Sequence, residues 1–141
     1  RAHRQLAALD VAGGTGAFTG DENTDANGAR QGPGRVVAGN LLARAGVLDA
    51  IADGFAGAEG PLPDRLLAAL RAGEAAGSDS RGLMSAALLV LTPDAPPLTL
   101  RIDWAEAPLD ALARLLARTR APDYADWLAT VPSLDAPHRP A

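Results

Sequence analysis

The hydrophobic pattern in the first third of the chain predicts short strands joined by polar, glycine-rich turns. Residues 4–10 and 15–19 are two short extended segments around a Gly-rich turn, which predicts a β-hairpin. Residues 20–34 are polar and contain several glycines, so they are predicted to form a loop. Residues 35–38 predict a third short strand.

Two helices are predicted next, from apolar residues that recur at helical spacing. The second helix begins near Pro63, a residue that suits the first turn of a helix, and it ends within the stretch 73–77. The first helix ends at the break 57–61. Its apolar face consists of Val47, Leu48, Ile51, Ala52 and Phe55.

The second half of the chain predicts two strands and one helix. Residues 85–91 form a continuous apolar run, which is typical of a central strand covered on both faces. Residues 98–103 alternate between apolar and polar, as in a strand with one buried face. Pro108 opens a third helix with an inner row of leucines. The predicted order is β-β-β-α-α-β-β-α with antiparallel hairpins, which is an α+β fold and not a series of βαβ units.

The chain is expected to form one domain with its own core. A chain of 141 residues is of single-domain length, and we place the domain at 1–131 and a Pro-rich tail at 132–141. The side chains expected to be buried together are Ile51, Leu66, Leu70, Leu88, Val90, Leu100, Ile102 and Leu112.

Composition and charge exclude several classes of partner. The net charge is -4, which supplies no field to attract nucleic acid or an anionic membrane. No apolar run approaches the ~20 residues that a membrane span needs. We therefore expect a soluble, cytoplasmic protein that binds neither nucleic acid nor membranes. Because the first residue is Arg1 and not Met, the chain is expected to be processed, trimmed or cut from a longer protein.

The residue types that are missing restrict the chemistry. The sequence has no Cys, which excludes thiol nucleophiles, disulfides and thiolate zinc sites. It also has no Lys, which excludes Schiff-base chemistry and the lysine of a P-loop. The two histidines, His3 and His138, lie near opposite ends of the chain. Ser, Thr, Asp, Glu, Asn, Arg and backbone amides remain as candidate groups, and no cofactor is predicted.

One segment has the opening spacing of a calcium-binding loop. Asp21, Asn23 and Asp25 alternate as the first ligands of such a loop do. However, Ala26 occupies the position that needs Gly, and Gly32 occupies the position of the bidentate Glu. The segment therefore indicates a solvated loop, and no metal site is predicted.

Polar residues at the ends of two predicted strands are the first candidates for a binding site. Asp79 and Arg81 lie just before the apolar strand 85–91, and Ser85 begins it. Polar groups at a strand end are well placed to line a cleft. Asn40 follows another strand, where the backbone either presents an amide to an oxyanion or forms a turn and a cap.

Arg101 and Asp103 share the polar face of the alternating strand, ~7 Å apart at the rise of a strand. A structural ion pair is the favoured interpretation of this pair, and a catalytic role is the alternative. We also expect Asp79, Arg81 and Asp103 to converge on one cleft at the end of strand 85–91.

Several blocks of the sequence resemble one bacterial family, catalogued as domain of unknown function 1028. The resemblance spans residues 4 to about 116 and depends on the order and spacing of the blocks. The blocks are residues 4–10 (RQLAALD), 17–20 (AFTG), 37–43 (VAGNLLA), 64–70 (DRLLAAL), 81–90 (RGLMSAALLV) and 100–103 (LRID).

The family fold is similar to that of the N-terminal-nucleophile (Ntn) hydrolases, a sandwich of two antiparallel sheets between helix layers. The resemblance implies an N-terminal segment, beginning with a strand, that we expect this chain to lack. In Ntn hydrolases the nucleophile is the first residue of such a strand, and Arg1 has no nucleophilic side chain. The resemblance therefore implies a partial sandwich whose catalytic residues are unknown. It also implies pairing with a second copy or with the missing N-terminal segment.

Two functions follow from the resemblance. The first is an amide (C–N bond) hydrolase of small molecules, in which this chain supplies one wall of the site. The second is a non-catalytic small-molecule-binding or assembly module of the same fold. Phe18 and Met84 favour the second function, because relatives often have His and Gln at these positions. The residues expected to orient a small-molecule ligand are Asn40, Asp79, Arg81, Ser85 and Asp103.

Overall fold

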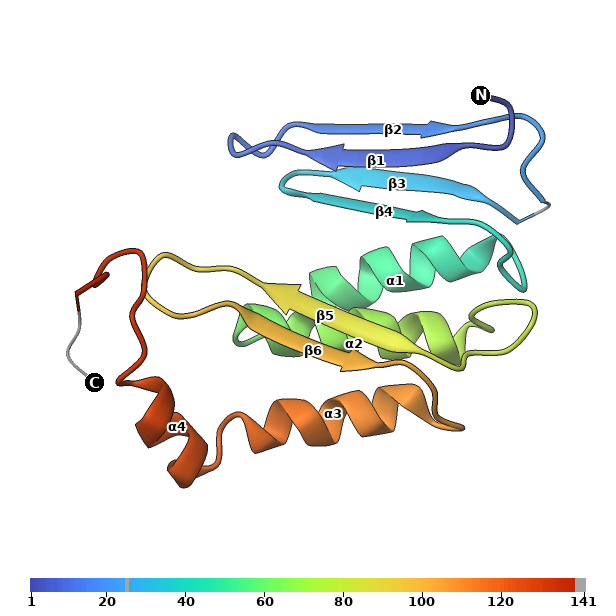
Figure 1. Ribbon diagram of the computed structural model, residues 1–141. Helices are drawn as coiled ribbons and strands as arrows, with labels where there is room; N and C mark the ends of the chain where they lie inside the picture. Colours follow the sequence, from blue (N-terminus) through green and yellow to red (C-terminus); the bar gives the residue numbers. More distant parts are fainter. Residues whose placement is uncertain (25, 139–141) are drawn as a thin grey trace. The chain divides into compact units, whose positions relative to one another are not determined.

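The computed structural model describes residues 1–24 and 26–138, which form an α+β structure as predicted (Figure 1). They divide into two compact units. Unit 1 comprises Arg1–Gly60 and Asp64–Leu83, and unit 2 comprises Pro61–Pro63 and the chain from Met84 onward. The order of elements in the described chain is β-β-β-β-α-α-β-β-α-α.

Unit 1 begins with the predicted hairpin. Strands β1 (Gln5–Leu9) and β2 (Thr15–Thr19) pair antiparallel, with Gln5 opposite Thr19 and Leu9 opposite Thr15. Asp10 closes the turn, because its carboxylate accepts hydrogen bonds from the backbone amides of Ala12 and Gly14 at 2.9 and 2.7 Å. This local bonding of an Asp side chain is a recurrent way to stabilise a tight turn.

A second hairpin corrects the prediction of a loop over residues 20–34. Strand β3 (Gly28–Gly32) pairs antiparallel with β4 (Arg35–Gly39), and the connection is Pro33-Gly34. Pro suits the first central position of a type II turn, and Gly34 has the positive φ, 64°, that the second position requires. Strand β3 was missed because its sequence, GARQG, has no apolar alternation; it forms by pairing with β4.

The two hairpins lie beside each other with their turns at the same end. β1 lies near β4 and β2 lies near β3, although no ladder of backbone hydrogen bonds joins the two pairs. At the turn end, the amide of Gly34 donates to the carbonyl of Gly13 at 3.3 Å. At the open end, the side chain of Gln5 connects the hairpins.

Helices α1 (Gly46–Gly57) and α2 (Leu62–Ala75) complete unit 1 and pack through small residues. A Cβ atom at Gly54 would lie 2.6 Å from the Cβ of Ala72, and one at Gly73 would lie 2.6 Å from the Ile51 side chain. Both glycines therefore permit a close approach of the helices. Val47 and Leu48 of α1 are 1% exposed, and α1 lies near β3 and β4.

Unit 2 contains a β-hairpin against a helix. Strands β5 (Ala86–Val90) and β6 (Leu98–Ile102) pair antiparallel, and helix α3 (Pro108–Arg118) lies near both. Helix α4 (Pro122–Leu128) follows and was not predicted from the sequence. The buried apolar side chains described in this unit include Leu88, Val90, Leu100, Pro108, Leu109, Leu112 and Leu116.

Strand β5 differs from its prediction as a central strand covered on both faces. In the described chain it belongs to a two-stranded sheet, and its residues alternate between exposed and buried. Leu89 is 59% exposed, whereas Leu88 beside it is 5% exposed. A continuous apolar run does not distinguish a strand buried on both faces from one that leaves an apolar face exposed. Of the predicted core, Leu88, Val90, Leu100 and Leu112 are buried, and Ile51, Leu66, Leu70 and Ile102 are half-buried.

The segment that follows α4 contacts the loop between β5 and β6 within unit 2. Ser133 is 7% exposed, and the amide of Asp135 donates to the carbonyl of Pro93 at 3.0 Å. The last three residues of the predicted tail, 139–141, lie outside the described residues. The domain bounds of 1–131 stay a prediction. Within residues 1–24 and 26–138, no helix combines the length and apolar character that a membrane span requires.

We predict that Leu88→Ala lowers the free energy of unfolding by about 2–5 kcal/mol, because it removes a buried side chain and leaves a cavity. The matched control is Leu89→Ala on the exposed face of the same strand, for which we expect a change of about 0.5 kcal/mol or less. Urea unfolding followed by circular dichroism measures both. Equal changes for the two variants would contradict the assignment of the buried face.

A second prediction concerns the apolar side chains that β1 and its turn expose. Leu6, Leu9 and Val11 are 67%, 51% and 110% exposed. Exposed strands and apolar patches favour pairing with another chain. We predict that the 141-residue polypeptide, prepared alone, self-associates at micromolar concentration. Light scattering combined with intact-mass spectrometry measures this, and a stable 14.3 kDa monomer would contradict it.

Candidate functional site

Three of the five predicted site residues, Asn40, Asp79 and Arg81, lie on two neighbouring loops of unit 1. One loop follows β4 and the other follows α2. The amide of Ser80 donates to the carbonyl of Leu41 at 2.8 Å, and an isolated antiparallel bridge joins residues 42 and 79. The amide of residue 43 also donates to the carbonyl of residue 78, at 2.9 Å. Backbone hydrogen bonds thus bring together two loops that are distant in sequence.

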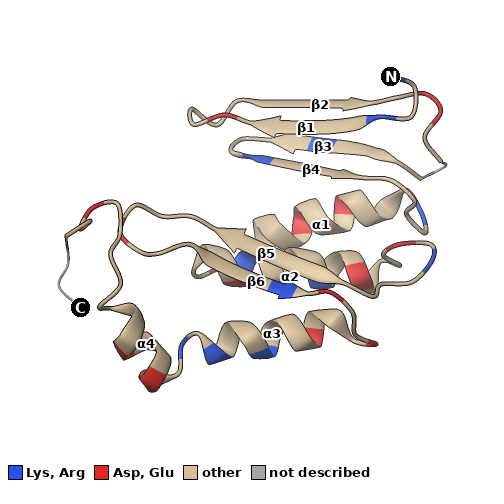
Figure 2. Cartoon of the chain, viewed as in Figure 1, with Lys and Arg blue, Asp and Glu red and all other residues tan. Residues whose placement is uncertain are grey.

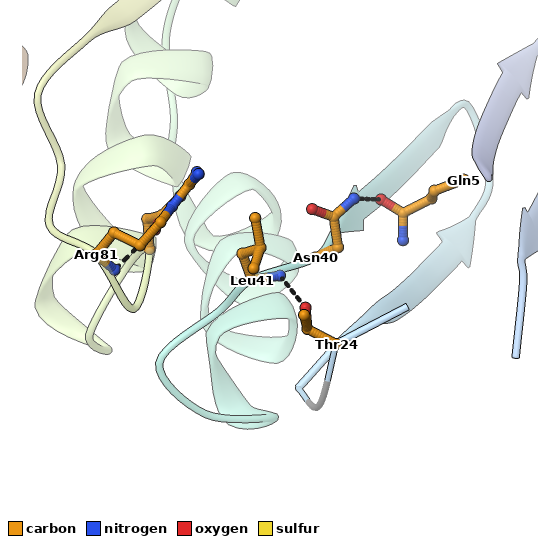
Figure 3. A network of polar contacts seen from close by, with 6 residues as sticks. Gln5, Thr24, Asn40, Leu41 and Arg81 are labelled. Atoms are coloured by element: carbon orange, nitrogen blue, oxygen red, sulfur yellow. Dashed lines mark hydrogen bonds and ion pairs between the residues drawn. The ribbon is translucent and has the colours of Figure 1, made fainter. Parts of the chain in front are cut away.

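A third segment, between β2 and β3, completes this arrangement. The hydroxyl of Thr24 accepts a hydrogen bond from the amide of Leu41 at 3.2 Å (Figure 3). The carbonyl of Ala26 accepts one from the amide of Leu42 at 3.3 Å. We refer to residues 24, 26, 40–43 and 78–81 as the polar loop cluster.

Each of the three segments contains a strained backbone position. Ala26, Leu41 and Ser78 have φ values of 53°, 55° and 56°, in the left-handed region. Among the described residues, they are the non-glycine residues with positive φ. Such a conformation costs roughly 1–2 kcal/mol at each position. It persists only where the surrounding bonds hold it, as they do here.

Asp79 and Arg81 form a bidentate ion pair within the cluster. The Arg81 Nε donates to Oδ1 of Asp79 at 2.9 Å, and its Nη2 donates to Oδ2 at 2.8 Å. The backbone amide of Arg81 also donates to Oδ1, at 2.8 Å. These bonds lower the pKa of Asp79 from 3.8 to about 2, and the hydrogen bonds from the guanidinium make the largest contribution. The Arg81 side chain is 65% exposed and that of Asp79 is 26% exposed, so a largely exposed guanidinium is held in one orientation.

Gln5 is a member of this site that the sequence did not reveal. Its side-chain nitrogen lies within hydrogen-bond distance of the Thr19 hydroxyl, at 3.1 Å, and of the carbonyls of Gly28 and Gly39, at 3.2 and 2.9 Å. Its side-chain oxygen accepts a hydrogen bond from Nδ2 of Asn40 at 3.3 Å (Figure 3). No sequence pattern marks Gln5, because a polar residue at the start of a strand is ordinary.

The amide of Asn40 is oriented by this contact. Its nitrogen points to Gln5 and its oxygen points the other way (Figure 3). The side chain therefore offers an acceptor. The neighbouring amides of Leu41, Leu42 and Ala43 already donate to Thr24, Ala26 and Ser78. The amides of these three residues therefore serve bonds within the cluster, and the two interpretations of the Asn40 backbone, an oxyanion donor or a turn and cap, stay predictions.

The other two predicted site residues, Ser85 and Asp103, belong to unit 2. Ser85 is exposed and precedes β5. Asp103 accepts a hydrogen bond from Nε of Arg101, and both side chains are more than 70% exposed. The pair is thus an exposed ion pair of the kind that contributes little to stability. The convergence of Asp79, Arg81 and Asp103 on one cleft stays a prediction.

The rest of the described chain is characterised by its charges, its possible metal ligands and a shallow hollow. Charged residues of both signs are spread over helices, strands and loops (Figure 2). No group of three His, Asp or Glu side chains capable of holding a metal ion occurs in residues 1–24 and 26–138, and Asp25 of the calcium-like spacing lies outside them. A shallow hollow of about 290 Å³ lies at the first hairpin turn, lined by residues 8–10 and 14–16. The bonds of Asp10 in it serve the turn.

Comparison with known proteins places the chain in a family. Residues 1–112 match the model of a family of unknown function, DUF1028. The chain belongs to this family. It is also similar to the crystal structure of a DUF1028 protein from Silicibacter pomeroyi, with 44% sequence identity and a TM-score of 0.91. The match covers 99% of this chain and 62% of that protein, so the chain spans about three-fifths of its relative's length. No curated protein matches the chain.

For this DUF1028 chain we predict that Arg81→Gln raises the pKa of Asp79 from about 2 toward 3.8, because the largest cause of the shift is removed. Carbon NMR titration of the carboxyl group measures the change. Because the pKa of Asp79 is lower in the folded protein than in the unfolded chain, ionised Asp79 stabilises the fold at pH values above about 4. This stabilisation disappears as the pH falls from about 4 to about 2. The variant should therefore lose less stability over that range.

Arg30→Gln is the matched control for this prediction. Arg30 forms the same bidentate type of pair with Asp49, also in unit 1 and also exposed. Its substitution should leave the titration of Asp79 unchanged. An Asp79 that titrates near 3.8 in the unsubstituted protein would contradict the geometry of the cluster.

Proposed function

We propose that the polar loop cluster binds a small polar molecule, and that the whole protein is an amide hydrolase with an Ntn-hydrolase-like fold. The observation that carries this proposal is the meeting of Asn40, Asp79 and Arg81 on loops whose backbone is strained at three positions. Strained residues cluster at ligand-binding and active sites, where surrounding bonds retain them for a purpose other than stability. The hydrolase part rests on the resemblance of the family fold to Ntn hydrolases.

Each group has a role that its bonds support. Arg81 is a fixed, exposed guanidinium, a group that suits an anionic part of a ligand. Asp79 positions Arg81 through the bidentate pair and stays ionised at neutral pH, because its pKa is about 2. Asn40 contributes a neutral hydrogen-bonding group. Ser85 and Asp103, which belong to unit 2, stay predictions from the sequence.

A second function, a non-catalytic binding module, has support from two other side chains. Met84 is 53% exposed. Phe18 is half-buried, and the guanidinium carbon of Arg1 lies over its ring, 5.1 Å from the ring centre. Neither side chain donates a proton or attacks a carbonyl. A protein of this kind would bind the same ligands and release no amine from them.

The test measures binding and hydrolysis separately on the full-length protein. Calorimetry with a panel of small amides and N-acyl amino acids gives affinities, and an amine-release assay gives turnover. We predict that Arg81→Gln weakens binding of anionic members by about 10-fold or more, because a hydrogen bond to a charged group contributes roughly 1.5–3 kcal/mol.

The matched control is Arg30→Gln, which removes a similar exposed arginine outside the cluster and should change affinity less than about 2-fold. Equal effects of the two variants, or no binding of any panel member, would contradict the proposed site. Binding without amine release would support the non-catalytic module.

A further inference from the structure

We propose that the ligand of the polar loop cluster carries an N–H donor beside a carboxylate, as N-acyl and N-carbamoyl amino acids do. In this proposal Asn40 Oδ1 accepts the N–H, Arg81 binds the carboxylate, and Gln5 is the positioning residue that sets the direction of the Asn40 amide. The inference rests on the proposed function of the cluster and names its class of ligand.

The orientation of Gln5 follows from its surroundings. Two backbone carbonyls, those of Gly28 and Gly39, lie 3.2 and 2.9 Å from its side-chain nitrogen. Carbonyls only accept hydrogen bonds, so the reverse orientation would set the Gln5 oxygen against two other oxygens. The oxygen of Gln5 must therefore face Asn40.

Asn40 has one orientation that satisfies this oxygen. Its Nδ2 donates to Gln5 at 3.3 Å, and its Oδ1 points away from Gln5 (Figure 3). Asn40 is an exposed residue, and in this proposal its oxygen meets the ligand. A donor on the ligand completes the amide, whereas a second acceptor in the same place would be repelled.

Arg81 supplies the complementary group. Asp79 binds its Nε and Nη2 atoms, and a guanidinium has five N–H donors in a planar fork. Its side chain is 65% exposed, and the bidentate pair fixes its plane. A ligand carboxylate suits such a fork, because its two oxygens accept parallel N–H bonds.

Asn40 and Arg81 lie on the two loops that meet at one backbone contact. Asn40 precedes Leu41 and Arg81 follows Ser80, and the amide of Ser80 donates to the carbonyl of Leu41 at 2.8 Å. An isolated antiparallel bridge between residues 42 and 79 joins the same two loops. In this proposal a single small molecule contacts both side chains.

The neighbouring backbone explains why the N–H, and not the carbonyl, of the ligand is selected. The amides of Leu41, Leu42 and Ala43 already donate within the cluster. They offer nothing to a ligand carbonyl. A ligand without the N–H would leave Asn40 Oδ1 without its donor, which lowers affinity.

The experiment compares three ligands by calorimetry on the full-length protein: N-acetylalanine, its N-methylated form and its primary amide. The N-methylated form lacks the N–H, and the amide lacks the carboxylate. We expect N-acetylalanine to bind at least about 5-fold more tightly than either of the other two ligands, because each of them loses one hydrogen bond or one charged contact.

Variants separate the two contacts. Asn40→Ala, at an exposed position, should abolish the preference for the N–H and keep the preference for the carboxylate. Arg81→Gln should do the reverse. Gln5→Ala should reduce the N–H preference while keeping the carboxylate preference, a pattern that a general loss of stability would not give. Thermal unfolding checks that each variant is folded.

The outcomes are distinguishable. Equal binding of N-acetylalanine and its N-methylated form would overturn the role of Asn40. If the protein binds other small amides but none of these three ligands, the proposed ligand class is overturned and the proposed function stands. No binding of any small amide or N-acyl amino acid would overturn the proposed function, and this inference with it.

Discussion

The side chain of Gln5 makes the contact on which the rest of the site depends. It joins the open ends of two hairpins that share no ladder of backbone hydrogen bonds, through the carbonyls of Gly28 and Gly39. A half-buried amide bonded on both its nitrogen and its oxygen belongs to a network, and removing it would leave partners unsatisfied. Because the same side chain accepts a hydrogen bond from Asn40, it determines both the packing of the two hairpins and the orientation of the Asn40 amide.

The polar loop cluster is held by backbone bonds and not by burial. Three segments exchange hydrogen bonds through residues 41–43, and these bonds retain three left-handed residues that would otherwise relax. Asp79 adds a second restraint, since one carboxylate binds both the backbone amide and the guanidinium of Arg81. An exposed arginine usually loses side-chain entropy when it binds a ligand. Here much of that entropy is already lost in the free protein, which favours binding.

The sequence predicted the fold wherever hydrophobic periodicity decides it. The alternation of β6 and the leucine row of α3 are examples, and the α+β class followed from them. Strand β3 was missed because partner pairing, not its own composition, forms it. In the polar loop cluster, Asn40, Asp79 and Arg81 are residues that the sequence marks as polar residues at strand ends. Gln5 and the strained Leu41 were not, because long-range bonds determine their roles and neither is a residue type that signals a turn.

The exposed groups of the cluster, the carboxamide of Asn40 and the guanidinium of Arg81, suit ligand recognition and not bond cleavage. A carboxamide oxygen and a guanidinium select a ligand, but neither attacks a carbonyl or transfers a proton at neutral pH. Asp79 is equally unsuited to act as a general base, because its pKa of about 2 makes it a weak one and its oxygens already accept three hydrogen bonds. In an amide hydrolase built on this fold, substitutions in the cluster would therefore change KM before they change kcat. In the proposed function, the cluster therefore selects the substrate, and groups outside the cluster break its bond.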